Sequence, residues 1–315
     1  EVTYGSLLQE RRGHLHGQIV AAIERLYADQ LNEQVERLAH HALRGQLWDK
    51  AVRYSRQTGK RALDRSAARE ALAAFEQARV ALRELPESQE RTEQFIDLCV
   101  EQRGALFPLA ELARLGEVLS EARALAEGLG DQRRLGWALA YLSNLYGLLG
   151  ELARAVEAAV RARTIAEAVG DLGLRVVVNY FLGHALWWSG DLRRAAAPLR
   201  AAIALVNSAP PGERFELAGL PAVLPRFVLA QVLAEVGEFA QAIAAGEEGL
   251  RIAESAGHAY SELWARHGLG FAHLRHGDFA QATRVLEPGL ALCRATENRH
   301  ALPLVAACLG SAYLG

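Results

Sequence analysis

The chain has 315 residues, 51% of them hydrophobic and 23% charged, and its 35 basic and 37 acidic residues leave a formal net charge of −2. This balance provides no overall field to attract nucleic acid or an anionic membrane, and the chain contains no run of about 18 apolar residues that would predict a membrane span. The three cysteines are widely spaced and form no Cys-x-x-Cys motif, which favours reduced, buried thiols and a cytoplasmic location.

The first predicted elements are a pair of helices at the N-terminus. Apolar residues at helical spacing predict a helix over residues 6–28 and a partner over residues 32–43. Gly45 interrupts this pattern, so we expect residues 1–45 to form a helical junction or N-terminal capping pair. The chain begins at Glu1 and contains no methionine, and we therefore expect it to be part of a longer polypeptide.

Further helix pairs are predicted after Gly45. A first helix over residues 48–63 precedes a second helix around Ala71, and residues 89–130 form a less regular pair with Pro108 and Gly116 around its turn. Clearer pairs follow at residues 133–149 with 152–169, 172–189 with 192–206, 221–236 with 239–256, and 259–275 with 279–296. A last helix over residues 302–314 has no partner, which gives about fifteen helices in total.

One stretch of sequence recurs along the chain. The segment VGEFAQAIAAGEEGLR at residues 236–251 returns as HGDFAQATRVLEPGLA at residues 276–291. Each copy contains a glycine, an acidic residue directly after it, and an alanine five positions after the glycine. The four such glycine and alanine pairs are Gly150 and Ala155, Gly190 and Ala195, Gly237 and Ala242, and Gly277 and Ala282. Glycine tolerates the left-handed conformation that closes a helix, and the acid suits the start of the next helix, so one supersecondary unit is stacked repeatedly.

A matching signal in the preceding helix completes the pattern. This signal is a leucine followed by a small residue that lies twelve positions before the alanine. The four dipeptides are Leu142-Ser143, Leu182-Gly183, Leu229-Ala230 and Leu269-Gly270. The combined pattern resembles the tetratricopeptide repeat. We therefore expect an all-α fold, a right-handed α-solenoid of tetratricopeptide-like antiparallel helix pairs, over residues 46–315.

A proline-rich connection interrupts this array at residues 207–225. It lengthens the spacing from Gly190 to the next closing glycine from 40 to 47 residues. Pro210, Pro211 and Pro221 exclude one regular helix there. Two interpretations are open, a linker packed on the array or a functional or mobile connection.

Three stretches resemble a more specific family. They are EVTYGSLLQERRGHLHGQIVAAIERLY at the start, EQVERLAHHALRGQLWDKAVRYSRQTGKRALDRSAAREA after it, and LGDQRRLGWALAYLSN at residues 129–144. They are similar to the C-terminal region of large bacterial proteins in which a class III nucleotide cyclase domain and a predicted signal-transduction ATPase precede a tetratricopeptide array. The resemblance covers essentially the whole chain and implies a regulatory or assembly role, without transferring cyclase or ATPase activity.

The motifs of catalysis, cofactor binding and metal binding are missing from the sequence. It contains no GxxxxGK[ST] phosphate loop, no Gly-x-Ser-x-Gly nucleophile elbow and no HExxH zinc motif. Gly268 and Gly270 lie in a predicted helix and indicate close helix packing. His40 and His41 point about 100° apart on a helix, which does not suit two ligands of one metal. We expect no catalytic residue, cofactor or metal ion, and hence a protein that is not an enzyme.

The first helices of the repeats are expected to line a concave groove. The register of the glycines and alanines places two rows of residues on this surface. The first row is Ala140, Tyr180, Phe227, His267 and Ala307, and the second is Asn144, His184, Gln231, Phe271 and Ser311. Aromatic and amide side chains suit an extended peptide or a small polar ligand, so Asn144, Tyr180, His184, Phe227, Gln231, His267 and Phe271 are the candidate binding residues. The alternative is that the aromatic residues are simply core.

Two functions follow from these observations. The first is a non-catalytic protein-interaction and regulatory scaffold that binds a protein or peptide in the groove, the partner including other domains of its own polypeptide. The second is a sensor array that binds a small effector and controls a neighbouring ATPase or cyclase domain. An open groove would favour the first, and a closed pocket of a few hundred cubic ångströms the second.

Overall fold

The computed structural model describes residues 9–65, 67–210, 212–215, 217–296, 298 and 300–315. These residues contain fifteen α-helices and one 3-10 helix, and no strand. Contacts between Cα atoms divide the chain into two units, residues 1–138 and residues 139–315. The division falls inside α8 (Gln132–Leu148).

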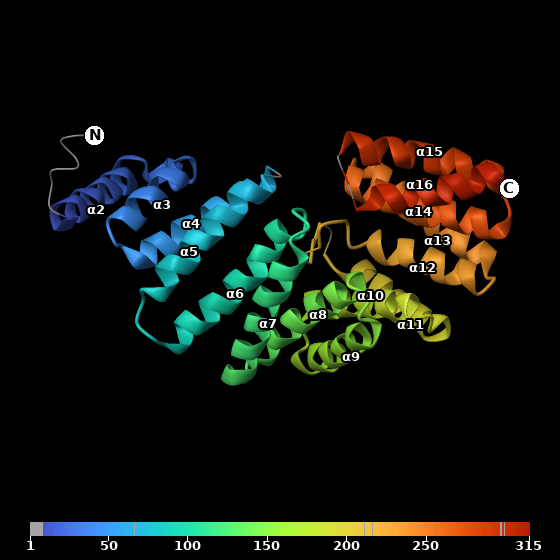
Figure 1. Ribbon diagram of the computed structural model, residues 1–315, viewed down its shortest axis with the longest axis horizontal. Coiled ribbons are helices and arrows are strands. Elements are labelled where there is room, and N and C mark those ends of the chain that lie inside the picture. The colour runs from blue at the N-terminus through green and yellow to red at the C-terminus, as the bar shows by residue number, and fades with distance from the viewer. Residues whose placement is uncertain (1–8, 66, 211, 216, 297, 299) are drawn as a thin grey trace. The chain divides into compact units, whose positions relative to one another are not determined.

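The helices of the first unit follow one another with short connections (Figure 1). They are α2 (Gln9–Leu26), η1 (Ala28–Gln34), α3 (Val35–Arg44), α4 (Trp48–Asp64), α5 (Ala68–Arg83), α6 (Gln89–Leu106), α7 (Leu112–Leu129) and the start of α8. The second unit contains the rest of α8, α9 (Leu152–Val169), α10 (Leu172–Trp188), α11 (Leu192–Ser208), α12 (Leu224–Glu235), α13 (Phe239–Ser255), α14 (Ala259–His276), α15 (Phe279–Ala295) and α16 (Ala301–Leu314).

Closing glycines define the ends of the helices, as the repeat pattern predicts. Gly150, Gly190, Gly237 and Gly277 all have positive φ angles between 77° and 86°, a region that glycine enters without the steric cost that a Cβ atom brings. Each is followed by the acidic N-cap residue of the next helix. Only one of these four acids, Asp278, accepts a bond from a backbone N–H, that of Gln281 at 3.1 Å. The other three carboxylates instead accept from the side chain three positions on, in the pairs Glu151 with Arg154, Asp191 with Arg194, and Glu238 with Gln241.

The predicted register between the two helices of a pair is also present. The Ser143 hydroxyl of α8 donates to the carbonyl oxygen of Ala155 on α9 at 2.8 Å. In the next pair, a Cβ atom at Gly183 would lie 3.1 Å from the carbonyl oxygen of Ala195. Small residues at these positions therefore let the paired helices approach closely, which confirms the tetratricopeptide-like pairing.

The structure corrects three predicted boundaries. Residues 28–34 form the 3-10 helix η1, so α3 begins at Val35 and not at residue 32. Gly116 lies inside α7, and the turn before it spans residues 107–111, where Ala110 has a φ of 57°. Helix α12 begins at Leu224, because Pro225 occupies its first turn, where a missing N–H costs no hydrogen bond. The predicted helix over residues 6–28 is present from Gln9 to Leu26, and its first residues lie outside the described part of the chain.

The proline-rich connection packs against the second unit. The backbone N–H of Leu220 donates to the hydroxyl of Ser261 on α14 at 2.7 Å. Val223 is fully buried and contacts Ala253 and Ala265. These contacts support the interpretation of residues 217–225 as a packed linker.

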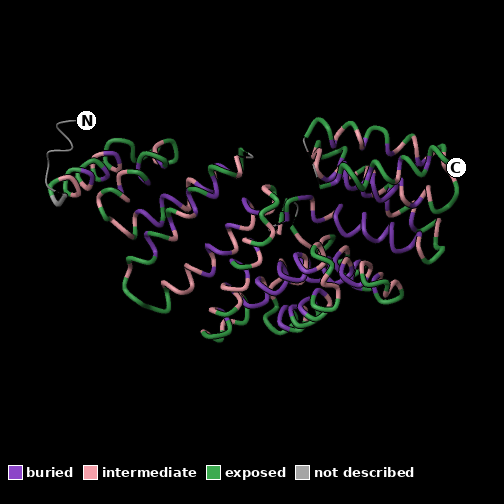
Figure 2. The backbone as a smooth tube through the Cα atoms, in the orientation of Figure 1, coloured by how far each residue is buried: buried purple, intermediate pink, exposed green. Residues whose placement is uncertain are grey.

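The fold is the expected α-solenoid of tetratricopeptide-like antiparallel helix pairs. Helices α10 and α12 are buried over most of their length (Figure 2), because second helices and neighbouring first helices cover them. The proposed division between residues 1–45 and 46–315 stays a prediction. It falls in the connection between α3 and α4, inside the first unit.

Candidate functional site

All of the predicted groove residues lie on the first helices of the second unit. Ala140 and Asn144 are on α8, Tyr180 and His184 on α10, Phe227 and Gln231 on α12, His267 and Phe271 on α14, and Ala307 and Ser311 on α16. The two rows differ in burial. The first row is buried except for Ala307, whereas the second row is half-buried or exposed except for Gln231, which is 1% exposed. The second row is therefore the more accessible of the two.

Three of these helices bring their aromatic side chains into one cluster. The His184 ring lies 5.8 Å from Tyr180 on the same helix and 6.0 Å from Phe227 on α12. The Phe227 ring in turn lies 6.2 Å from His267 on α14. Tyr180, His184, Phe227 and His267 therefore form a continuous chain of ring contacts, as the assigned register predicts.

Sequence reasoning missed two members of this cluster. Trp188 stacks on His184 with ring centroids 3.8 Å apart, and Trp264 lies 5.2 Å from Phe227. Both are found by extending the rows along each helix. Trp188 is four residues after His184, and Trp264 is three residues before His267, so each shares a helical face with a predicted residue.

The remaining predicted residues lie apart from the ring cluster. Phe271 is half-buried, with the guanidinium of Arg275 5.1 Å from its ring centroid. Asn144 is half-buried on α8, and the exposed Ser311 hydroxyl donates to the carbonyl oxygen of Ala307. These three residues are accessible but are not joined to the cluster by ring contacts.

Five polar atoms among the described residues of the second unit are buried without a hydrogen-bond partner. One is Nδ1 of His273, near the end of α14. The other four belong to His184 (Nδ1), Gln231 (Oε1), Trp264 (Nε1) and His267 (Nδ1). We call these four residues the unpaired set. Buried polar groups nearly always have a partner, and leaving one without costs free energy. The described part of the first unit contains four further such atoms, but here three of the four residues, His184, Trp264 and His267, meet around the one ring of Phe227.

The histidines of the cluster are uncharged at neutral pH. Burial, with a smaller effect of His300, lowers the pKa of His184 to about 3, and burial lowers that of His267 to about 4. The Sγ atom of Cys308 lies 3.6 Å from Nε2 of His267. Burial raises the pKa of this thiol, which is the opposite of what an activated thiolate needs. The cluster can therefore bind by stacking and by hydrogen bonding between neutral groups.

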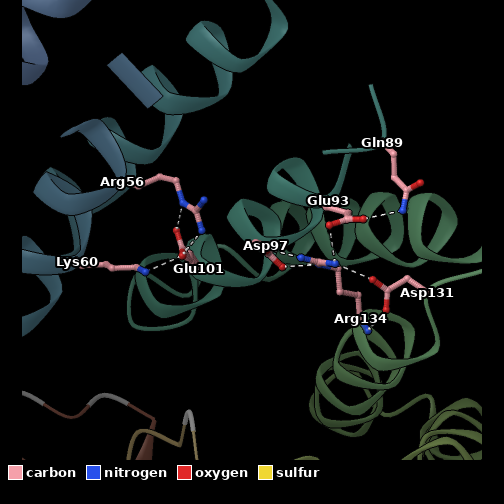
Figure 3. Close-up of polar contacts among 8 residues, drawn as sticks. All are labelled: Arg56, Lys60, Gln89, Glu93, Asp97, Glu101, Asp131 and Arg134. Atoms are coloured by element: carbon pink, nitrogen blue, oxygen red, sulfur yellow. Dashed lines mark hydrogen bonds and ion pairs between the residues drawn. The ribbon is translucent and has the colours of Figure 1, made fainter. Parts of the chain in front are cut away.

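The first unit contains a cluster of charged side chains on α6. Glu93, Asp97 and Glu101 recur every four residues on α6 and share one face (Figure 3). Arg56 and Lys60 of α4 pair with Glu101 at 2.7 and 2.9 Å.

Nearer the start of α6, Arg134 of α8 pairs with Glu93 at 3.3 Å and Asp97 at 2.8 Å of the same row, and with Asp131 at 2.7 Å. These ion pairs raise the pKa of Arg134, the bond to Asp97 most of all. Every member of this network is paired, so it ties α4, α6 and α8 together.

A second group of histidines lies near the N-terminus. His40 is exposed and His41 half-buried, with the Nδ1 atoms of His41 and His16 2.7 Å apart. Burial is the largest cause that lowers the pKa of both His16 and His41. Among the described residues no three histidine, cysteine or carboxylate side chains are grouped so as to hold a metal ion. None of the described helices is long and apolar enough to cross a membrane.

Comparison with known proteins supports the repeat architecture. A tetratricopeptide repeat family model matches residues 225–295, which cover α12 to α15. A search of curated proteins finds no match.

Solved structures share the fold. One is a Rap protein complexed with Competence and Sporulation Factor, 12% identical, with 97% of each chain covered and a TM-score of 0.59. Another is the Rap conjugation gene regulator of plasmid pLS20 in complex with the Phr* peptide, 17% identical, covering 87% of this chain and 74% of that chain, with a TM-score of 0.58.

A third similar structure is a signal transduction ATPase with numerous domains from Pyrococcus horikoshii, which has a tetratricopeptide repeat sensor. It is 15% identical, with 89% of this chain and 43% of that chain covered and a TM-score of 0.53. These low identities carry information on the fold alone. The chain thus has the fold of a tetratricopeptide-like α-solenoid, with a tetratricopeptide repeat match over residues 225–295.

Proposed function

We propose that the chain is a non-catalytic scaffold that binds a protein or peptide partner on the first helices of the second unit. The observation that supports this proposal is the aromatic cluster, in which α10, α12 and α14 join stacking rings to neutral polar side chains. Aromatic side chains that also carry polar groups are typical of the centre of an interface. Two of the similar structures contain a Rap protein with a bound factor or peptide, which favours an extended peptide as the partner.

The accessible residues would touch the partner first. His184 and Phe271 are half-buried, so each keeps ring surface available while its position is fixed by packing. Asn144 adds a side-chain amide on the same row. Tyr180 and Phe227 pack against the His184 ring and would hold it in place.

We further propose that this scaffold regulates a larger bacterial, cytoplasmic signalling protein. The similarity to a signal transduction ATPase with a tetratricopeptide repeat sensor supports this context, as does the match of the present chain to less than half of that protein. In this arrangement the partner includes other domains of the same polypeptide. The alternative partner is a small effector that this array would sense.

A peptide-display selection tests the proposal. A library of random twelve-residue peptides would be selected on the immobilised chain, and the affinity of the selected peptides measured by fluorescence anisotropy. Phe271→Ala and His184→Ala are expected to weaken binding at least tenfold, since interface aromatics commonly contribute about 2 kcal/mol or more. The control is Arg251→Ala on the exposed side of α13, where the guanidinium pairs only within its own helix. A selection that yields no peptide, or peptides that bind all three variants alike, contradicts the proposal.

A further inference from the structure

The unpaired set differs from an ordinary buried network because none of its four polar atoms has a partner or contact with water. Gln231, Trp264 and His267 are 1%, 6% and 5% exposed, so water does not satisfy these side chains either. A buried polar group without a hydrogen bond makes the free chain less stable. If the group gains a hydrogen bond only in a complex, this lost free energy is recovered on binding.

The chemistry of the four groups indicates what they would bind. The indole N–H of Trp264 can only donate, and Oε1 of Gln231 can only accept. Nε2 of His267 faces the thiol of Cys308 at 3.6 Å. Because burial keeps this thiol protonated, it donates to Nε2, and Nδ1 of His267 then carries the proton and is a donor. His184 is neutral and can present either role.

Donors and an acceptor in one uncharged region match an amide group. An amide carbonyl oxygen accepts two hydrogen bonds, and its N–H donates one. A carboxylate can only accept hydrogen bonds and would be repelled by the acceptor oxygen of Gln231. An ammonium group can only donate and would be repelled by the indole N–H of Trp264. No ion pair among the described residues involves His184 or His267, and burial is the main cause that keeps both neutral.

The spacing along the helices suits successive amides of one extended chain. Gln231 lies one turn after Phe227, which is about 6 Å along α12, and Phe227 touches both Trp264 and His267. An extended peptide advances about 3.4 Å per residue. Two or three residues of main chain therefore cover this distance and present alternating N–H and C=O groups.

The packing of α12 against α14 shows why these groups are closed off in the free chain. A Cβ atom at Gly268 would lie 2.7 Å from the carbonyl oxygen of Phe227, so the two helices touch backbone to backbone. His184 is the half-buried member of the set, and its ring covers Phe227 edge-on at 6.0 Å. His184 is therefore the member of the set that a ligand would reach first.

We propose that the unpaired set is a binding site for the main-chain amides of an uncharged, extended peptide segment, and that the four groups acquire their hydrogen bonds only in the complex. This inference rests on the proposed peptide-binding function. It adds that the four unpaired polar groups lower the stability of the free chain and strengthen its binding to a peptide.

Two conservative variants separate this role from a structural one. Trp264→Phe removes the indole N–H and keeps an aromatic ring, and Gln231→Leu replaces the amide with an apolar group of similar size. Each removes an unpaired polar atom, so the free chain is expected to melt at the same temperature as the parent or higher. The affinity for peptides selected on the parent chain is expected to fall at least tenfold. Peptides N-methylated at their central amides should show the same loss on the parent chain.

The outcomes are distinct. If peptides are selected but bind the two variants as tightly as the parent, the peptide-binding function stands and the site assignment is overturned. If Gln231→Leu, which keeps the size of the side chain, melts well below the parent, the amide has a partner within the free chain, and the inference is again overturned. A selection that yields no peptide removes the proposed function together with the inference. Thr164→Ala on α9, which is a second helix, serves as the control, because the hydroxyl it removes is exposed and already bonded to Val160.

Discussion

Two glycines forty residues apart show how much the surroundings of a residue decide its role. Gly270 on α14 and Gly310 on α16 occupy the same position after a leucine in their repeats. A Cβ atom at Gly270 would overlap the side chain of Leu286 on α15, whereas a Cβ atom at Gly310 would meet nothing within 4 Å. The sequence makes the two look alike, and only the neighbouring helix distinguishes them.

The pair gives a matched prediction. Gly270→Ala is expected to lower the free energy of unfolding by about 1–3 kcal/mol, because Leu286 and its helix must shift. Gly310→Ala is expected to raise it by about 0.5–1 kcal/mol, because alanine loses less backbone entropy in a helix. Urea unfolding followed by circular dichroism measures both. Equal effects of the two substitutions would contradict the packing described here.

The buried histidines predict a loss of stability in acid. The pKa of His184 is about 3 and that of His267 about 4 in the folded chain, against about 6.5 when unfolded. Between pH 4 and 6.5 the unfolded chain therefore binds more protons, so the free energy of unfolding falls as the pH falls. Each of the two histidines is expected to contribute about 1.4 kcal/mol per pH unit in this window. Urea unfolding of the parent and of His184→Phe at several pH values checks this. The free energy of unfolding of the variant should change less steeply with pH, because the contribution of His184 is gone. An unchanged slope would show that folding does not lower the pKa of His184.

At the scale of helices, Arg134 joins two elements of the first unit. Its guanidinium, 24% exposed, bonds Asp97 on α6 and Asp131 at the start of α8. The second bond also fixes the cap, because Asp131 accepts the backbone N–H of Arg134 at 2.9 Å. The arginine therefore fastens the first turn of α8 to the face of α6.

Removal of this arginine should loosen the contact between the two helices. Arg134→Met is expected to cost about 1–2 kcal/mol, more than an exposed ion pair, because three carboxylates lose their partner at once. Arg251→Met on α13 is the control, expected within about 0.5 kcal/mol, since its pair with Glu248 is exposed and local. A double-mutant cycle with Asp97→Asn measures the coupling. A coupling near zero would show that the network contributes no stability.

At the scale of the whole molecule, the two units are expected to unfold separately. Repeat helices contact mainly their neighbours, so destabilising one region need not unfold the other. Gly59 provides the change in the first unit, because a Cβ atom there would overlap the ring of Phe75. The tryptophans provide the probe, because Trp187, Trp188 and Trp264 belong to the second unit.

The experiment uses a Trp48→Phe, Trp137→Phe background, which leaves fluorescence only in the second unit. In that background Gly59→Ala should move part of the circular dichroism transition to lower urea and leave the fluorescence midpoint in place. A single transition that shifts in both signals would mean that the chain unfolds as one cooperative body.

The sequence predicts the pairs from α8 to α15 well, because each pair has its own closing glycine, acid and small residue. It predicts α6 and α7 less well, since Gly116 lies inside α7 and a non-glycine residue, Ala110, takes the positive φ of the turn. The grouping of Tyr180, His184, Phe227 and His267 follows from the predicted register, whereas their role in binding stays a prediction. The sequence left open whether the aromatic residues are core, and Tyr180 and Phe227 are buried as that alternative expects, whereas Phe271 is only half-buried. The repeat pattern could not decide between the two, because burial depends on how closely α12 and α14 approach.

The left-handed glycines have a consequence for how such a chain could change in length. Of the eight in the described part of the chain, seven fall at residues 130, 150, 170 and 190, and again at 237, 257 and 277, twenty residues apart within each series, and the eighth, Gly212, lies in the proline-rich connection. Both halves of a repeat therefore end in the same way after the same number of residues. An insertion or deletion of forty residues adds or removes one whole repeat, so every later helix keeps its packing position. A change of a few residues inside a helix would instead turn the rest of that helix about its axis and move its apolar residues off the buried side. The seven extra residues between Gly190 and Gly237 fall in the connection after α11, where the chain absorbs them outside any helix. Gain or loss of whole repeats is thus the mildest way for this protein to acquire a longer or shorter binding surface.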